Sequence, residues 1–449
     1  MLVAPLARRL ESMSITVEPS ASPVAELRPP LSHDEVVLEA DRCLACRGPY
    51  AVAPCTLACP AQVDVPAFVD ALAHDDVLTA AQTIFAENIL GGTCARVCPV
   101  EVLCEGACVL AHEGQKPIQI AALQRYATDW ALVRDLPLRQ PTAPTGHAVA
   151  DVGAGPAGLA CAGELAARGH GVTVFETRTE IGGLARFAIA PYRIQSAPLP
   201  AEQRALEALG VRFRLGAPIS CVGELSAYDA VFLGVGLGDD VPLELPGDEL
   251  SGIWESLPFI EALKAGRLRD VGDRVIVIGG GNTAIDVARE SLRLGATHVT
   301  LMYRRTREDM PAYAFEVEEA EEEGVTFAWR TLPVRFLGVD QVSAVECVSV
   351  RRGPPDASGR RLPVPVPGSE FDLRADTVIK AIGQRPRPEL SGRFGGLELE
   401  HGNVVVDDEG RTTSQRVFAG GDAVNGGVSV VEAVRHGKRA AFAIDRSLT

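Results

Sequence analysis

The chain has 449 residues, of which 47% are hydrophobic and 23% charged, a composition typical of a folded globular protein with several domains. Its formal net charge of −16 argues against nucleic acid or an anionic membrane surface as a partner, because both would repel an acidic protein. We also expect no membrane span, since no apolar run approaches the roughly 18 residues that a span requires.

The first 31 residues contain Pro and Ser without clear periodicity, and this pattern predicts a loose lead-in. They hold no convincing secretory signal, so we expect a cytoplasmic protein. Residues 32–147 follow a helical pattern, which opens with a capping box at Ser32 and Glu35. A Pro- and Thr-rich linker at 136–146 ends this predicted domain.

The helical region carries eight of the eleven cysteines. Cytoplasmic proteins seldom keep disulfides, so this crowding indicates metal. Thiolates two or three residues apart, with a Cys-Pro step in each of two runs, are typical of two four-iron clusters that exchange ligands between the runs. Zinc and disulfides are the alternatives, although zinc would usually show two clean C-x2-C pairs per site. The spacing is Cys43-x2-Cys46-x8-Cys55-x3-Cys59-Pro60, then Cys94-x3-Cys98-Pro99-x4-Cys104-x3-Cys108.

A strand, a glycine-rich turn, a helix and a second strand follow over 149–176. The turn reads G-x-G-x-x-G, in which the first glycine permits the tight turn and the second lets the backbone approach a pyrophosphate. The third glycine lets helix and strand pack closely, and the carboxylate that ends the second strand can bind a ribose hydroxyl. This unit predicts a dinucleotide site made by Gly153, Gly155, Pro156, Ala157, Gly158 and Glu176.

Asp151 is unexpected in the first strand of this unit, because a buried parallel strand favours apolar residues. An unpaired carboxylate there would be costly, or it would take up a proton. We therefore expect either a partner for Asp151 or a weakened strand that binds its dinucleotide less tightly.

A second unit of the same kind spans 275–303, and its turn reads G-x-G-x-x-A. The unit ends at Arg304 and Arg305 rather than at a carboxylate, and guanidinium groups can clamp a 2′-phosphate. NADPH is therefore favoured over NADH, unless these arginines are ordinary surface charge. The predicted cofactor-binding residues of this turn are Gly279, Gly281, Asn282, Thr283 and Ala284.

Two further segments carry no predicted site. The Glu-rich run 316–323 indicates a solvated helix face. The Arg-, Pro- and Gly-rich segment 351–367 indicates a hairpin or an exposed loop.

From about residue 41 to its end, the chain resembles a family that includes the small chain of bacterial glutamate synthase and the NAD(P)H-oxidising subunit of bacterial dihydropyrimidine dehydrogenase. It is more similar to the second branch. The stretches that carry the resemblance are CARVCP at 94–99, CEGAC at 104–108, both glycine-rich turns, Gly182-Gly183 and GGD at 420–422.

The resemblance implies an α/β fold with two Rossmann-like dinucleotide-binding domains, preceded by an α-helical iron–sulfur domain. The NAD(P)-binding domain would be inserted in a split FAD-binding domain. We place the iron–sulfur domain at 32–147, the FAD-binding domain at 148–265 and 374–449, and the NAD(P)-binding domain at 266–373.

The dihydropyrimidine dehydrogenase branch also implies the ligands of two [4Fe-4S] clusters, with Cys94 as a structural residue. Eight residues separate Cys46 from Cys55 where the family usually has four, which lengthens a loop beside the first cluster. The implied ligands are Cys43, Cys46, Cys55 and Cys108 for the first cluster, and Cys59, Cys98, Cys104 and Gln124 for the second.

For FAD, the family implies that Gly182 and Gly183 pass close to the flavin and that Gly421 and Asp422 meet its ribityl chain. A helix beginning near Val428 would direct its N-terminus toward the isoalloxazine. The strands at 231–236 and 378–383 resemble the crossovers between the two nucleotide domains.

The implied function is electron input: NAD(P)H reduces FAD, and the two clusters pass single electrons onward without any catalytic side chain. The sequence shows no domain for a final substrate, so we expect a catalytic partner subunit, one that carries FMN. Gln124 favours a partner that reduces a pyrimidine, and a glutamate synthase large chain is the alternative. A third hypothesis is a degenerate, non-catalytic scaffold, for which Asp151 is the only support.

Overall fold

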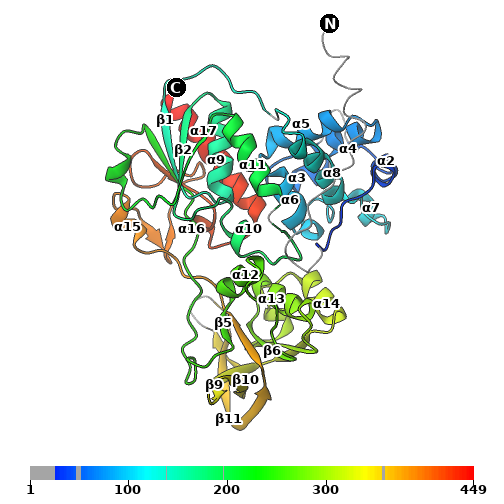
Figure 1. Cartoon of the computed structure of the whole chain (residues 1–449), viewed down its shortest axis with the longest axis vertical. Helices are drawn as coiled ribbons and strands as arrows, with labels where there is room; N and C mark the ends of the chain where they lie inside the picture. The colour runs from blue at the N-terminus through cyan, green and yellow to red at the C-terminus, as the bar shows by residue number, and fades with distance from the viewer. Residues whose placement is uncertain (1–25, 47–51, 138, 196, 356–358, 360) are drawn as a thin grey trace.

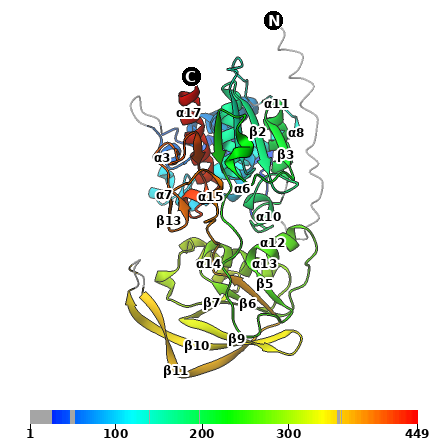
Figure 2. The same ribbon diagram turned by 90° about the vertical axis from the view of Figure 1, so that its left-hand side faces the viewer.

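The computed structural model of the chain describes residues 26–46, 52–137, 139–195, 197–355, 359 and 361–449. A helical lobe comes first and lies beside a lobe built on a five-stranded sheet, as Figure 1 shows. A second five-stranded sheet, with a smaller three-stranded sheet attached, forms the opposite end of the molecule (Figure 2).

The helical lobe confirms the helical pattern of the N-terminal region. The capping box at Ser32 and Glu35 is present, and Asp64 accepts the backbone N–H of Ala67 at the start of another helix. Phe68 and Phe85 are fully buried in its core. The helices are α2 (His33–Asp41), α3 (Pro54–Leu57), α4 (Val65–Ala73), α5 (Val77–Glu87), α6 (Gly91–Val97), α7 (Val109–His112) and α8 (Ile120–Val133).

The described end of the lead-in is anchored rather than loose. The backbone N–H of Leu27 donates to the Tyr192 carbonyl oxygen, and Arg28 Nη1 donates to the Cys98 carbonyl oxygen at 3.0 Å. Glu26 forms an ion pair with Arg125 at 2.7 Å. Residues 26–28 therefore connect the helical lobe to the segment around Tyr192.

The first sheet has the order β15-β4-β1-β2-β3, and all its pairs are parallel. On one face it packs against α9 (Pro156–Ala167) and α17 (Val430–Leu448), whose close approach depends on glycine. A Cβ at Gly437 would lie 2.1 Å from the Ala157 carbonyl oxygen. The strands are β1 (Ala148–Val152), β2 (Gly171–Glu176), β3 (Arg212–Leu215), β4 (Ala230–Leu233) and β15 (Val417–Ala419).

One hydrophobic core runs from the helical lobe into this sheet. It joins Phe68 and Leu123 of the helical lobe to Val149 and Val174 of the sheet through the apolar face of α9. The cysteine-bearing helices are therefore held rigidly against the first nucleotide-binding unit.

The second sheet has the order β5-β12-β6-β7-β8, again all parallel, and carries α12 (Ser256–Lys264), α13 (Asn282–Arg293) and α14 (Ala314–Glu322). Strands β1 to β4 of the first sheet precede this domain in the sequence, and β15 of the same sheet follows it. The domain is therefore inserted in the first, and the predicted fold class is confirmed. Its strands are β5 (Ile253–Glu255), β6 (Arg274–Gly279), β7 (His298–Tyr303), β8 (Thr326–Trp329) and β12 (Thr377–Ala381).

The boundaries of the inserted domain differ from the placement at 266–373. The segment from β5 through α12 belongs to the second sheet, and so does β12, which pairs with both β5 and β6. The apolar pattern of β12 resembles that of β4, so only the pairing of the strands shows to which sheet each belongs.

The third sheet is antiparallel and confirms the hairpin expected near 351–367. It consists of β9 (Thr331–Gly338), β10 (Val342–Pro355) and β11 (Arg361–Arg374), in the order β11-β10-β9. Figure 2 shows the long β10–β11 hairpin extending across the end of the second sheet.

Buried polar contacts fix the two nucleotide-binding domains against each other. Lys264 Nζ donates to the carbonyl oxygens of Ala185, Ile189 and Ile194 at 2.8–3.1 Å. Arg193 pairs with Asp286 at 2.6 Å, across the same interface. The relative orientation of the two sheets is therefore held by charged groups as well as by apolar packing.

The Glu-rich run on α14 is solvated only in part: Glu318, Glu321 and Glu322 are exposed, as its composition predicted, but other glutamates are covered. Glu316 is only 3% exposed and pairs with Arg193 at 2.9 Å. Glu319 and Glu323 both bind Arg289, which is itself buried. Glu316 is buried, and Glu319 and Glu323 are partly covered, because cationic partners arrive from α13 and from the segment before α11 (Pro198–Ala208).

Candidate functional site

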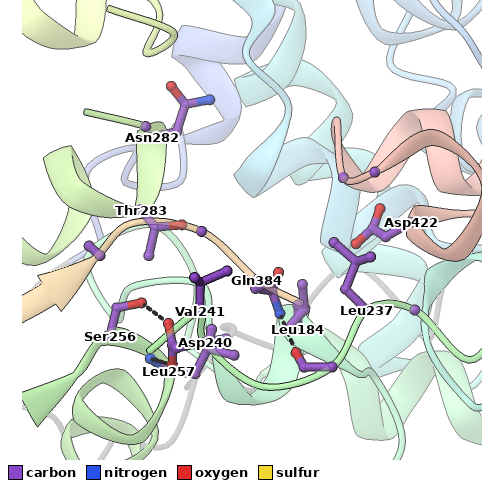
Figure 3. A pocket seen from close by; sticks show the side chains of 18 of the residues that line it. Leu184, Leu237, Asp240, Val241, Ser256, Leu257, Asn282, Thr283, Gln384 and Asp422 are labelled. Carbon is purple, nitrogen blue, oxygen red and sulfur yellow. Dashed lines mark hydrogen bonds between the residues drawn. The ribbon is translucent and has the colours of Figure 1, made fainter. Parts of the chain in front are cut away.

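A cavity of about 1360 Å³ lies between the two sheets and is lined by both glycine-rich turns. Figure 3 shows Asp422 on one side of this cavity and Asn282 and Thr283 on another. The predicted cofactor-binding residues that line it are Gly153, Gly155, Pro156, Ala157, Glu176, Gly183, Gly279, Gly281, Asn282, Thr283, Arg304, Arg305, Gly421, Asp422 and Val428.

The first glycine-rich turn has the geometry that a pyrophosphate needs. Gly153 has a φ of 107°, and a Cβ there would lie 2.5 Å from the Gly234 carbonyl oxygen. At Gly158 a Cβ would lie 2.0 Å from the Gly153 carbonyl oxygen, so only glycine fits. Gly155, in contrast, faces open space, with its nearest neighbour atom at 3.8 Å. The turn thus leaves room beside the N-terminus of α9, where phosphates bind.

Glu176 lies at the end of β2 and reaches back to this turn. Its Oε2 accepts the backbone N–H of Ala154 and its Oε1 accepts that of Arg178, both at 2.8 Å. The two contacts fix the carboxylate at the edge of the cavity. Gly182 also contacts the turn, since its N–H donates to the Ala154 carbonyl oxygen at 2.8 Å.

The second glycine-rich turn repeats this geometry in the other domain. At Gly279 a Cβ would lie 2.1 Å from the Ala381 carbonyl oxygen, whereas none of the described atoms would lie within 4 Å of a Cβ at Gly281. Ala284 is fully buried against the sheet. Asn282 Oδ1 accepts the backbone N–H of Tyr313 at 3.0 Å, which fixes the first residue of α13.

Asp422 lies at the start of the short helix α16 (Asp422–Asn425), in the same cavity. Burial raises its pKa above the usual value, against a backbone hydrogen bond from Val428 that lowers it. Helix α17 starts at Val430 after a Ser429 cap, two residues beyond the start expected at Val428. Its N-terminus is adjacent to the cavity, because Ser429 and Val430 both line it.

Four of the predicted iron ligands surround a second, smaller cavity in the helical lobe. Its lining includes Cys43, Cys46, Cys55 and Cys108 together with apolar side chains such as Val65. The long loop between Cys46 and Cys55 therefore does not remove Cys55 from the group. Sulfur donors from three separate segments converge there, as a four-iron cluster requires.

The other predicted ligands lie deeper. A hydrogen bond with Cys94, followed by burial and by nearby Cys59 and Cys104, raises the pKa of Cys98 well above its usual value. Cys94 is thus next to Cys98 rather than apart from it, and it is buried. Gln124 Nε2 donates to the Gly91 carbonyl oxygen at 2.8 Å, so its Oε1 is the end left to bind iron.

Among the described residues, no three His, Cys, Asp or Glu side chains lie close enough together to hold a single metal ion. The same part of the chain contains no helix that is long and apolar enough to cross a bilayer.

Several residues that line the main cavity had no signal in the sequence. Leu237, Asp240 and Gln384 belong to the two crossover segments, which bind each other through Gln384 Nε2 and the Gly238 carbonyl oxygen at 3.2 Å (Figure 3). Arg193 lines it as well. Only the similarity between the sequences of β4 and β12 indicated that these segments would meet.

Two Rossmann-like domains that face one cavity, beside a helical domain with clustered cysteines, define an NAD(P)H-dependent FAD oxidoreductase with an iron–sulfur domain. Residues 20–136 match the family described as dihydropyrimidine dehydrogenase domain II, 4Fe-4S cluster. Residues 147–437 match the pyridine nucleotide-disulphide oxidoreductase family. The iron–sulfur prediction is thereby confirmed over zinc and disulfides.

Two relatives of similar length are both NADPH glutamate synthase small chains. The chain is 37% identical over 440 residues to the NADPH glutamate synthase small chain of Halomonas elongata, a match that covers 94% of this chain and 92% of that relative. The small chain of Escherichia coli is also 37% identical, with 93% of each chain covered. FprA of Mycobacterium tuberculosis, solved with NADPH, is 21% identical with a TM-score of 0.56 over 67% of this chain and 84% of that one, a likeness of fold alone.

The chain therefore belongs to the family of glutamate synthase small chains and related FAD- and iron–sulfur-dependent oxidoreductases. It is an NADPH-oxidising electron-transfer subunit that uses FAD and [4Fe-4S] clusters. The enzyme prediction is confirmed, and the scaffold hypothesis is not supported.

Proposed function

We propose that this chain is the NADPH-oxidising small subunit that supplies electrons to a glutamate synthase large chain. The observation that carries the proposal is the extent of the match. Glutamate synthase small chains are covered over 92–93% of their own length, whereas the oxidoreductase AegA of Escherichia coli is covered over 69%. Each domain of the small chains thus has a counterpart here.

In this proposal the first glycine-rich turn binds FAD and the second binds NADPH. Glu176 holds the adenosine ribose of FAD, and Asp422 contacts its ribityl chain. When bound, FAD accepts a hydride and releases single electrons. The chain's own residues orient the two cofactors across the cavity, and no side chain acts as acid, base or nucleophile.

The cysteines would then hold the two relays that lead to the partner. Cys43, Cys46, Cys55 and Cys108 bind the first cluster, and their convergence on one cavity supports this set. Cys59, Cys98, Cys104 and Gln124 bind the second. The partner carries the site for the final substrate and, in this proposal, FMN.

Replacing Arg304 and Arg305 together with glutamine is expected to lower kcat/KM for NADPH by one or more orders of magnitude. Charge-assisted hydrogen bonds to the 2′-phosphate contribute about 1.5–3 kcal/mol each. Steady-state ferricyanide reduction with NADPH and with NADH measures the effect, and the NADH value should barely change. Equal losses for both nucleotides would show that the arginines do not read the 2′-phosphate.

The partner is tested by reconstitution. Alone, the chain should reduce ferricyanide with NADPH but should form no glutamate from glutamine and 2-oxoglutarate. Adding a glutamate synthase large chain should produce NADPH-dependent glutamate. Substrate turnover by the lone chain would contradict the subunit assignment, and no turnover with the large chain would contradict this choice of partner.

A subunit that reduces a pyrimidine is the second candidate partner. Gln124 favours it, because the dihydropyrimidine dehydrogenase branch uses a glutamine ligand where glutamate synthase small chains more often have Glu. The description of the family that matches residues 20–136 points the same way. NADPH-dependent reduction of uracil or thymine with such a partner, without glutamate formation, would favour this candidate.

A further inference from the structure

Arginines gather at one end of the main cavity, and they come from two distant parts of the chain. Arg304 and Arg305 follow β7, and Arg361 begins β11, more than fifty residues later. All three line the cavity, together with Thr331 and Gly359. The β10–β11 hairpin thus forms a wall of the nucleotide site.

Two neighbouring arginines have their charge neutralised by carboxylates. Arg307 Nη1 binds both carboxylate oxygens of Glu321 at 2.7 Å. Arg352 Nη2 binds Asp309 and the Thr306 hydroxyl, each at 3.0 Å. These two side chains brace the loop after β7 and are poorly suited to bind an added anion.

Arg304 and Arg361 differ from them. In the described part of the chain neither forms an ion pair with a carboxylate. Among the described residues, the one hydrogen bond of the Arg361 guanidinium is to the Gly353 carbonyl oxygen, at a long 3.4 Å. Two exposed guanidinium groups that line one cavity wall and form no ion pair with a described carboxylate are a site for a dianion. Glu308, which also lines this end, carries a single opposing charge.

The backbone fixes Arg361 beside the loop after β7. Its carbonyl oxygen accepts Arg305 Nε at 3.2 Å. In the pairing of β10 with β11, Arg361 lies opposite Pro355, and Pro363 lies opposite Arg352. A bulge separates these two pairs. The backbone N–H of Arg330, just before β9, donates to the Arg305 carbonyl oxygen at 3.0 Å. The hairpin is therefore attached to this loop through both β9 and β11.

We propose that Arg361, supplied by the β10–β11 hairpin, binds the 2′-phosphate of NADPH together with Arg304 and so determines nucleotide specificity. The inference rests on the proposed role of the second glycine-rich turn as the NADPH site. That turn places the ribose at the end of β7, beside Arg304 and beside Arg305, which contacts Arg361. Specificity then depends on a residue outside the βαβ unit.

The test measures equilibrium binding of NADP⁺, NAD⁺ and 2′,5′-ADP to the FAD-loaded full chain. Arg361→Gln should weaken NADP⁺ and 2′,5′-ADP by about 10- to 100-fold and leave NAD⁺ within about twofold. Arg361→Lys should recover part of the loss, because it keeps the charge without the planar fork. The dependence of NADP⁺ affinity on salt should also become shallower in Arg361→Gln.

The matched control is Arg374→Gln, at the far end of the same strand. This variant should bind NADP⁺ like the wild type. Unchanged NADP⁺ affinity in Arg361→Gln, or equal weakening of NADP⁺ and NAD⁺, would overturn the inference. A wild-type chain that binds no NADP⁺ would instead contradict the proposed NADPH site, so the two failures are distinguishable.

Discussion

Cys98→Ala is expected to remove one of the two clusters and to abolish electron delivery to the partner. Cys98 is partly buried beside Cys94, Cys59 and Cys104, and without its thiolate the second cluster lacks one of its predicted ligands. Iron content should fall from about eight to about four atoms per chain. Partner-dependent turnover should fall to background, while most ferricyanide reduction remains, because a small dye can take electrons near the flavin.

Cys94→Ala is the matched control, since Cys94 is the immediate neighbour of Cys98 in space. If Gln124 is the fourth ligand, Cys94→Ala keeps the iron and Gln124→Ala loses part of it. The reverse pattern would make Cys94 the ligand, which its hydrogen bond to Cys98 allows. Full iron content in Cys98→Ala would contradict the ligand set as a whole.

Asp151→Val is expected to stabilise the FAD-binding domain by about 1–3 kcal/mol, the usual cost of a buried polar group without a partner. Asp151 is completely buried in β1, and both of its carboxyl oxygens lack a hydrogen bond among the described residues. A Cβ at Gly158 would lie 2.9 Å from Asp151 Oδ1, so the carboxyl sits directly beneath the glycine-rich turn. Urea unfolding at a fixed FAD concentration measures the gain.

The gain should depend on pH. Burial raises the pKa of Asp151 well above the ordinary value of an aspartate, so the folded chain keeps a proton that the unfolded chain releases above about pH 4. This group therefore lowers the free energy of unfolding as pH rises from about 4 toward its folded pKa, by at most about 1.4 kcal/mol per pH unit.

Asp151→Asn separates the effect of the titration from the cost of the unpaired polar group, because it removes the first and keeps the second. The gain in unfolding free energy of Asp151→Asn over the wild type should grow with pH. The gain of Asp151→Val should contain the same pH-dependent part and, in addition, a constant part from removing the unpaired polar group. Cys161 of α9 is a titratable neighbour of Asp151, and it remains in each variant. A less stable Asp151→Val would mean that the carboxyl has a partner in solution.

The sequence by itself determined the local units of this protein. Each glycine-rich turn follows from steric demands inside a few residues: a Cβ at Gly153 or Gly279 would collide with a backbone carbonyl of the crossover strand, so glycine is required. The cysteine spacing likewise carries the cluster chemistry, because a thiolate pair two or three residues apart binds iron from one turn. The two dinucleotide-binding units and the iron–sulfur clusters could be predicted on that basis, whereas FAD, the split domain and the family followed from the resemblance.

Only the tertiary structure decided how distant segments meet. Arg361 lines the main cavity because backbone hydrogen bonds attach β9 and β11 to the loop after β7, which is far away in the sequence. Glu316 of α14 is buried because Arg193 arrives from another segment to pair with it. Likewise, β12 joins the second sheet by pairing with β6, although its sequence resembles β4. Ion pairs and strand order depend on interactions between segments that are far apart in the chain. Composition and periodicity describe local sequence and carry no information about these interactions.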